Sequence, residues 1–198
     1  MQDFKQKKNM KKLALFAVLF GSLAFGQSKK VTSSEVKWWG YKIAKSEASS
    51  HYGTVNVKSG DVVMKGSNIT GGTFVLDMNS INATDIGPDK GQTKLNEHLK
   101  NGDFFEVEKF PTATYKITSV TKSANKNYPF TVNGNLTAKG KTSAVSFPAK
   151  ITLNKGVLNI ASDKFSFDRQ KFGISYASAM KDVVVKDDID MTINVTAK

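Results

Sequence analysis

Apolar and polar residues alternate at every second position through most of the chain. Ala113, Tyr115 and Ile117 are each separated by a Thr or Lys, and the same pattern recurs over residues 130–138 and 145–153. Such alternation places the apolar side chains on one face of a β-strand and the polar ones on the other. It is typical of antiparallel sheets with one buried and one wet face.

Further segments rich in β-forming residues precede this region. Val31–Lys45, Thr54–Lys65 and Ile69–Ile81 are predicted strands, and the polar segment Ser46–His51 between the first two is predicted to be a loop. Short turns such as Lys139-Gly140-Lys141 separate successive runs later in the chain. We count about eight strands, which predicts an all-β antiparallel barrel or a sandwich. An eight-stranded barrel has room inside for side chains or one small ligand.

One segment has a helical pattern instead. Leu95 and Leu99 are four residues apart and therefore share a helix face. Gly102 follows as a predicted left-handed C-terminal stop, and Phe104 and Phe105 come directly after it. A short amphipathic helix followed by two aromatic residues is expected to lean into an apolar hollow. His98 lies off the leucine face and is expected to point away from it.

The N-terminus reads as a targeting segment. Five lysines precede an apolar stretch, Leu13–Phe25, which at 13 residues is too short for the roughly 20 that a membrane-spanning helix needs. Small residues at Ala24 and Gly26 fit a cleavage site, although Met10 could equally be the start. We therefore expect a signal peptide at 1–26 and one domain at 27–198. Export is expected, and without cysteines the domain must rely on core burial.

The charge is strongly positive but spread out. The formal net charge is +12, of which the leader contributes +4, leaving +8 for the predicted mature chain. Lysines scattered singly along strands usually mark the solvent face, and attraction to an anionic membrane surface or an acidic ligand is the alternative interpretation. A nucleic-acid partner is not expected, because no basic cluster is interleaved with aromatic residues.

Few residues suggest catalysis. The chain has no Cys and only two His, so neither a nucleophile with its base nor a metal-ligand spacing is evident. Arg169 follows Asp168 between aromatic residues, where a guanidinium could fork onto phosphate or carboxylate oxygens at a cavity mouth. The structural alternative is a strand-end ion pair of Arg169 with Asp168 or Glu97.

Several ordered motifs resemble those of the YceI-like family. They are LNEHLKNGDFFEVEKFP at residues 95–111, VNGNLTAKGKT at 132–142 and FDRQKFGI at 167–174, with further likeness around 51–53 and 72–81. The resemblance covers nearly the whole mature chain. One departure is Lys139, which occupies a position where the family often has His.

This resemblance implies a lipocalin-like, eight-stranded antiparallel barrel with one short helix at its mouth. It further implies export to the periplasm and an isoprenoid lipid, polyprenyl or quinone-like, in the lumen. No catalysis, cofactor or metal is expected. A transient contact with a membrane surface is expected, and the protein is expected to be a monomer or a homodimer. The alternatives are a stress-related or adhesive barrel working through its outer surface, and an enzyme acting on the bound lipid.

A prenyl chain offers almost no directional groups, so its site must be lined by apolar side chains. For any single residue, plain core packing is the competing interpretation. The predicted ligand-binding residues are Phe74, Leu76, Met78, Leu99, Phe104, Phe105, Tyr115, Ile117, Phe130, Val132, Phe147, Phe165, Phe167 and Arg169.

Overall fold

A computed structural model describes residues 26–44, 47–178 and 180–198. The predicted signal peptide and its cleavage site fall almost wholly outside the described residues and stay a prediction. Between Gln27 and Ala197 the regular structure is mainly β-strand, with one α-helix and two 3₁₀ turns among the described residues.

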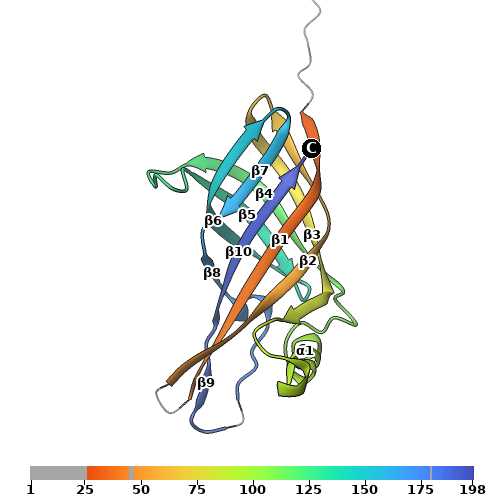
Figure 1. Cartoon of the computed structure of the whole chain (residues 1–198), viewed down its shortest axis with the longest axis vertical. Coiled ribbons are helices and arrows are strands. Elements are labelled where there is room, and N and C mark those ends of the chain that lie inside the picture. Colours follow the sequence, from red (N-terminus) through yellow and green to blue (C-terminus); the bar gives the residue numbers. More distant parts are fainter. Residues whose placement is uncertain (1–25, 45–46, 179) are drawn as a thin grey trace, which may run out of the picture.

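Eight strands close into one antiparallel barrel (Figure 1). Each is paired with its neighbours in sequence order up to the last, which returns to pair with the first. This confirms the predicted eight-stranded antiparallel barrel and excludes the sandwich. The barrel strands are β1 (Gln27–Ala44), β2 (Glu47–Lys65), β3 (Asn68–Ala83), β4 (Thr112–Lys122), β5 (Phe130–Ala138), β6 (Lys141–Asn154), β7 (Val157–Ser162) and β10 (Asp188–Ala197).

Two short strands lengthen the barrel wall at one end. β8 (Phe165–Asp168) takes over from β7 along β10, and β9 (Val183–Val185) pairs with the end of β1. Strict alternation along residues 157–168 predicts that Phe165 and Phe167 face the opposite way from Leu158 and Ile160. This prediction was wrong, because both phenylalanines line the cavity together with Ile160. The two-residue break between β7 and β8 shifts the alternation by one, so that all four apolar side chains point inward.

The polar segment after β1 is also a strand rather than the predicted loop. β2 begins at Glu47, and residues 47–50 pair with Tyr41–Ala44 at the end of β1. Pairing there uses backbone groups alone, and Ala48, Ser49 and Ser50 remain exposed. Sequence alternation could not reveal a strand with no buried face.

The helix lies at the lower end of the barrel in Figure 1, between β3 and β4. A 3₁₀ turn, η1 (Pro88–Lys90), leads into α1 (Gln92–Lys100). The predicted left-handed stop at Gly102 was wrong: the helix ends on Asn101 in an extended conformation, and the left-handed residues are Gly91 before the helix and Glu106 after it.

The opposite, hairpin end of the barrel is solidly filled. Val62, Met64, Ala149 and Leu158 are at most 1% exposed, and Met64 and Leu158 lie next to the β2–β3 and β6–β7 turns. Their packing closes that end. The space inside the barrel therefore lies toward α1.

Candidate ligand cavity

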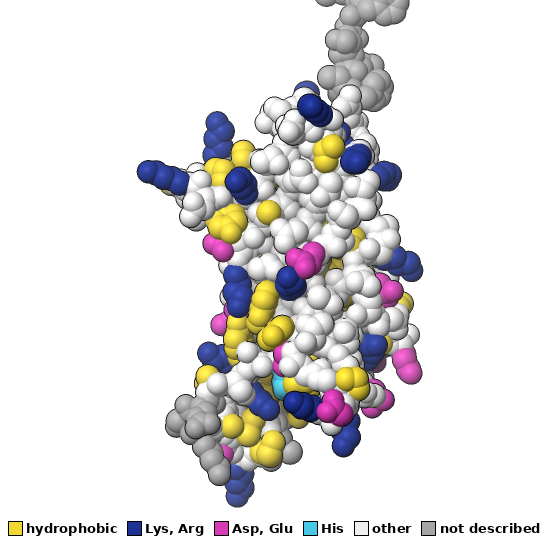
Figure 2. Space-filling model, viewed as in Figure 1, with side chains coloured by type: hydrophobic (Ala, Val, Ile, Leu, Met, Phe, Trp, Pro, Cys, Tyr) yellow, Lys and Arg dark blue, Asp and Glu magenta, His cyan; other side chains and the backbone are white. Residues whose placement is uncertain are grey.

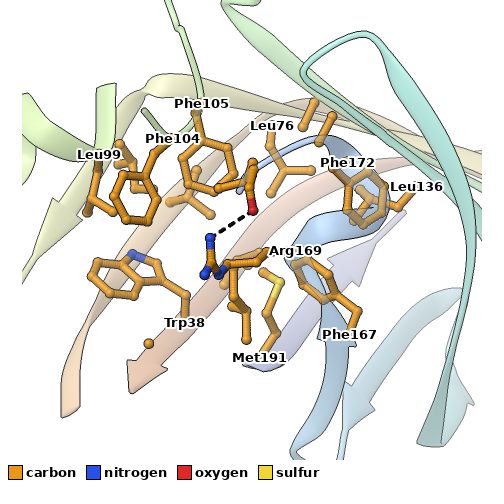
Figure 3. A pocket seen from close by; sticks show the side chains of 18 of the residues that line it. Trp38, Leu76, Leu99, Phe104, Phe105, Leu136, Phe167, Arg169, Phe172 and Met191 are labelled. Carbon is orange, nitrogen blue, oxygen red and sulfur yellow. Dashed lines mark hydrogen bonds between the residues drawn. The ribbon is translucent and has the colours of Figure 1, made fainter. Parts of the chain in front are cut away.

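A cavity of about 360 Å³ lies inside the barrel, walled almost wholly by apolar side chains. Figure 3 shows Leu76, Leu99, Phe104 and Phe105 facing Arg169 and other side chains across it. The volume falls in the range of about 300–1,000 Å³ typical of small-molecule sites. Its walls come from the inward faces of the strands, and two further segments close its lower end.

All but one of the predicted site residues lie at this cavity, while their contact with a ligand stays a prediction. Phe130 is the exception. It is the first residue of β5 and pairs with Lys122 and Ala149, which places it past the filled section of the core, although on the inward side. Those at the cavity are Phe74, Leu76, Met78, Leu99, Phe104, Phe105, Tyr115, Ile117, Val132, Phe147, Phe165, Phe167 and Arg169.

The first closing segment is the lid, which we define as residues 92–111. Leu95, Leu99, Phe104 and Phe105 of the lid all face the cavity, as their spacing predicts. Its far end is tied to β3, where the Met78 amide donates to the Pro111 carbonyl (3.0 Å).

The helix itself is also fixed to the end of β3. The Asn96 side chain accepts from the Ala83 amide (2.8 Å) and donates to the Asn82 side chain (2.7 Å). The side-chain amide of Gln92 donates through Nε2 to the Ala83 carbonyl (2.6 Å). These polar ties orient α1 so that its apolar face meets the lumen.

Lys139 holds the middle of the lid. Its ammonium group donates to the Gly102 carbonyl (2.6 Å) from the β5–β6 turn. Lys139 and Gly140 form a two-residue turn in which both residues have positive φ, 47° and 71°, as a type I′ hairpin requires. The residue that departs from the family pattern is thus a contact between barrel wall and lid.

The second closing segment is the strap, residues 173–178 and 180–185, which crosses the same end without regular structure until β9. It is joined to the lid by three rings. The His98 ring meets Phe104 and Tyr176 edge-on, with ring centroids 5.0 Å and 4.6 Å from its own. The ring centroids of Phe104 and Tyr176 are 5.1 Å apart. The expectation that His98 points away from the hollow was wrong, because this contact turns its ring toward the cavity.

Arg169 holds the strap in place by hydrogen bonds to its backbone. It belongs to the 3₁₀ turn η2 (Arg169–Phe172) and is 3% exposed. Its guanidinium donates to the carbonyls of Ile174 (2.8 Å), Tyr176 (2.9 Å) and Lys186 (3.1 Å); Figure 3 draws one such bond.

The ion-pair partner of Arg169 is Asp187, with 3.0 Å between Nη2 and Oδ1. It is neither Asp168 nor Glu97, the two alternatives that the sequence suggested. Asp168 instead caps η2 by accepting from the Gln170 amide (2.8 Å). Arg169 therefore lies at the cavity with most of its donors engaged by the protein.

Tyr115 brings a buried hydroxyl group into the barrel wall. Its hydroxyl donates to the Val145 carbonyl (2.9 Å), and burial raises its pKa. Gly134 lies against the ring, where an added Cβ would be 2.4 Å from it. The glycine inside β5 thus lets the Tyr115 ring pack closely against the strand.

Both histidines reach the cavity, and each has an aspartate partner. His51 Nδ1 is 2.7 Å from Asp85 Oδ2, and His98 Nε2 is 3.2 Å from Asp103 Oδ2. Among the described residues, neither ring is hydrogen-bonded to a hydroxyl group, and no three His, Cys, Asp or Glu gather as a metal site.

The described helices include none long and apolar enough to cross a membrane.

Sequence reasoning missed the strap and part of the far wall. Ile174 and Tyr176 line the cavity although the strap has no periodic pattern to reveal it. Met191, Ile193 and Val195 do alternate along β10, and this signal could have placed them there. Trp38 could be assigned to the wall only once the register of β1 was known.

Fold and cavity together define a class: a closed antiparallel β-barrel with an apolar lumen, covered at one end by a lid and a strap. Residues 27–197 match the model of the YceI-like domain, and the chain belongs to that family. It is 28% identical over 127 residues to protein YceI of Escherichia coli O6:H1, a match covering 60% of this chain and 61% of that protein. The match to protein YceI of Salmonella newport is 28% over 147 residues and covers 73% of each.

Solved structures share the fold at low sequence identity. BcnA of Burkholderia cenocepacia aligns with a TM-score of 0.56 at 17% identity, over 83% of this chain and 96% of that one. A domain from Saccharophagus degradans, described as polyisoprenoid-binding, aligns with a TM-score of 0.56 at 9% identity, over 86% and 97%. The Campylobacter jejuni YceI protein aligns with a TM-score of 0.51 at 13% identity, over 100% and 99%.

Proposed function

We propose that this protein is an exported, periplasmic or secreted, binding protein that sequesters or carries an isoprenoid-type lipid, polyprenyl or quinone-like, in its barrel. The observation that carries the proposal is the apolar cavity of about 360 Å³ under a lid that the chain itself provides. Apolar burial contributes about 25 cal/mol per Å² of surface removed from water. A flexible hydrocarbon chain is therefore the kind of ligand that such a wall would hold.

The fold likeness to the Saccharophagus degradans domain supports the choice of lipid, since that domain is described as polyisoprenoid-binding. Binding rather than chemistry is supported by the polar groups at the cavity. Arg169 is engaged by backbone carbonyls and Asp187, and neither histidine activates a hydroxyl among the described residues. The protein would act by holding and releasing its ligand unchanged.

The test is to purify the mature protein under native conditions and to weigh what it carries by native mass spectrometry and lipid extraction. A co-purified prenyl lipid, or uptake of ubiquinone or a polyprenol by stripped protein, is expected. An empty barrel that takes up neither would count against the proposal.

A matched pair of variants locates the ligand. Phe104→Ala removes a ring from the cavity wall, whereas Phe130→Ala removes one outside it. We expect Phe104→Ala to release bound lipid at least tenfold faster and Phe130→Ala to leave retention unchanged. Equal retention by both variants would mean that the lid ring is ordinary core.

A further inference from the structure

One wall of the barrel is devoid of carboxylates. The strands β4 to β7 and their turns, residues 112–162, contain seven lysines and not one Asp or Glu. All the acidic residues of the mature chain lie outside this segment. Because β4 to β7 are neighbours in the sheet, the segment forms a single continuous face of one sign.

The lysines of this wall are not neutralised by neighbouring strands. In the described part of the chain, the ion pairs of Lys and Arg involve Lys37, Lys109, Lys164 and Arg169. None of these belongs to β4–β7, and Lys139 donates to a backbone carbonyl instead. The positive charge of the wall is therefore available to an external anion.

The upper corner of this wall also presents apolar side chains. Val120, Phe130 and Ile151 are only partly buried, and Leu153 is 42% exposed. Strand pairing brings them together on the inward side of β4, β5 and β6, past the filled core. We call these four residues the apolar tip.

Lysines surround the apolar tip. Lys122 lies directly opposite Phe130 in the sheet. Lys126, Lys150 and Lys155 come from the adjoining turns and strand. The β4–β5 hairpin projects from the barrel in Figure 1, and in the same view Figure 2 shows lysines with hydrophobic side chains between them at that position. The carboxylates visible in Figure 2 lie below this region.

We propose that the β4–β7 wall and the apolar tip dock the protein on an anionic phospholipid bilayer. Each lysine close to an anionic membrane surface contributes about 1 kcal/mol, and apolar side chains at the tip can enter the headgroup region. A soluble polyanion would use the lysines but would leave Leu153 and Phe130 in water, so the tip favours the bilayer. Docking goes beyond the proposed function: it would hold the protein at the bilayer in which isoprenoid lipids reside, with the lid at the opposite end of the barrel from the tip.

The experiment is co-sedimentation of the mature protein with vesicles of phosphatidylcholine alone and with 30% phosphatidylglycerol. Binding only to the anionic vesicles, reversed by 0.5 M salt, is expected. Lys122→Glu/Lys126→Glu should lower the bound fraction at least tenfold. Lys58→Glu/Lys90→Glu changes the net charge equally at exposed sites away from the wall and should bind as the parent does.

Leu153→Ser isolates the tip and should weaken vesicle binding without changing binding to heparin. Equal losses in both double variants, or no binding to anionic vesicles, would overturn the proposal. Binding to heparin without binding to vesicles would do the same and would identify an acidic macromolecule as the partner. Because docking is scored without reference to bound lipid, a barrel that docks but carries no lipid would refute the proposed function alone.

Discussion

At the scale of single residues, Arg169 organises the strap, a segment without regular structure until β9. Its guanidinium binds carbonyls of Ile174 and Tyr176 as well as Asp187. Arg169→Gln would leave several buried carbonyl groups without donors, each at about 1–3 kcal/mol. We expect a loss of roughly 3 kcal/mol in the free energy of unfolding, measured by urea denaturation, and faster trypsin cleavage at Lys181.

The control for this prediction is Lys171→Gln, which changes an exposed cation of the same turn and should have no effect on either measurement. Unchanged strap cleavage in Arg169→Gln would contradict the anchoring role.

The sequence placed Arg169 among aromatic residues correctly, yet it could not reveal this role. Apart from Asp187, the partners are backbone carbonyls, which leave no trace in the pattern of side chains.

Asp190 gives the stability a pH dependence. Partial burial alone would raise the pKa of its carboxyl, but hydrogen bonds from Ser166 and Tyr41 act in the opposite direction. The ammonium group of Lys164, 3.5 Å away, adds to them, and the pKa is held below its ordinary value. A carboxyl whose folded pKa is depressed contributes stability above its unfolded pKa, near 3.9, and loses it as the pH falls through the folded pKa.

We therefore expect Asp190→Asn to be less stable than the parent at pH 7 but to show a smaller further loss between about pH 5 and pH 2. Thermal unfolding across this range checks the difference in slope. Glu35→Gln is a useful comparison, since Lys37 also lowers the pKa of that carboxyl but at a highly exposed site. Parallel curves for the parent and Asp190→Asn would contradict the assignment.

At the scale of elements, the lid depends on a turn that lies far from it in sequence. Lys139 donates to the Gly102 carbonyl from the first position of a two-residue turn with φ of 47°. Lys139→Asn keeps a residue that tolerates this conformation but is too short to reach the lid. A single hydrogen bond of this kind contributes about 0.5–1.5 kcal/mol, so we expect lipid release to accelerate about two- to tenfold in a stopped-flow transfer assay.

The β6–β7 hairpin supplies the matched control. Lys155 has the same φ of 47° and also precedes a glycine, but it lies at the opposite end of the barrel. With a soluble lipid acceptor and no vesicles, so that membrane docking has no part in the measurement, Lys155→Asn should leave release unchanged. Equal acceleration in both variants would place the effect in turn chemistry rather than in the lid.

The helix of the lid could be predicted from the spacing of Leu95 and Leu99, and its cover over an apolar hollow from the Phe pair that follows. Its exact end could not, because Asn101 ends the helix in an extended conformation where Gly102 was expected to turn. The direction of His98 also depended on Tyr176, which is 78 residues away in sequence and belongs to the strap. Local periodicity carries no information on such a contact.

At the scale of the whole molecule, the barrel was predictable because one face of nearly every strand is apolar. Its interior was predictable for the same reason: alternation assigned Tyr115, Ile117 and Val132 to the inward face. Alternation does not say where along an inward face the core is filled, so Phe130 was placed in the cavity although it lies past the packed end. The break between β7 and β8 could not be predicted, because the two residues between these strands move the following apolar side chains to the other face of the alternation.

A barrel with one filled and one hollow end should depend on its ligand for stability. A ligand that binds only the folded state stabilises it by RT ln(1 + [L]/Kd), about 2.7 kcal/mol at a hundredfold excess over Kd. For a domain of this size 1 kcal/mol corresponds to about 2–4 °C in Tm. We therefore expect stripping the lipid to lower Tm by roughly 5–10 °C, and adding it back in detergent-free transfer to restore Tm with increasing concentration.

A cavity-filling variant tests the same coupling. Leu136→Trp fills the cavity from β5 and should raise the Tm of the stripped protein relative to its loaded form, so that the difference in Tm between the two forms shrinks. Leu153→Trp lies outside the cavity and should leave this difference in Tm intact. A Tm that is independent of lipid in the parent would mean that the hollow end is stable without an occupant and that the cavity does not couple binding to folding.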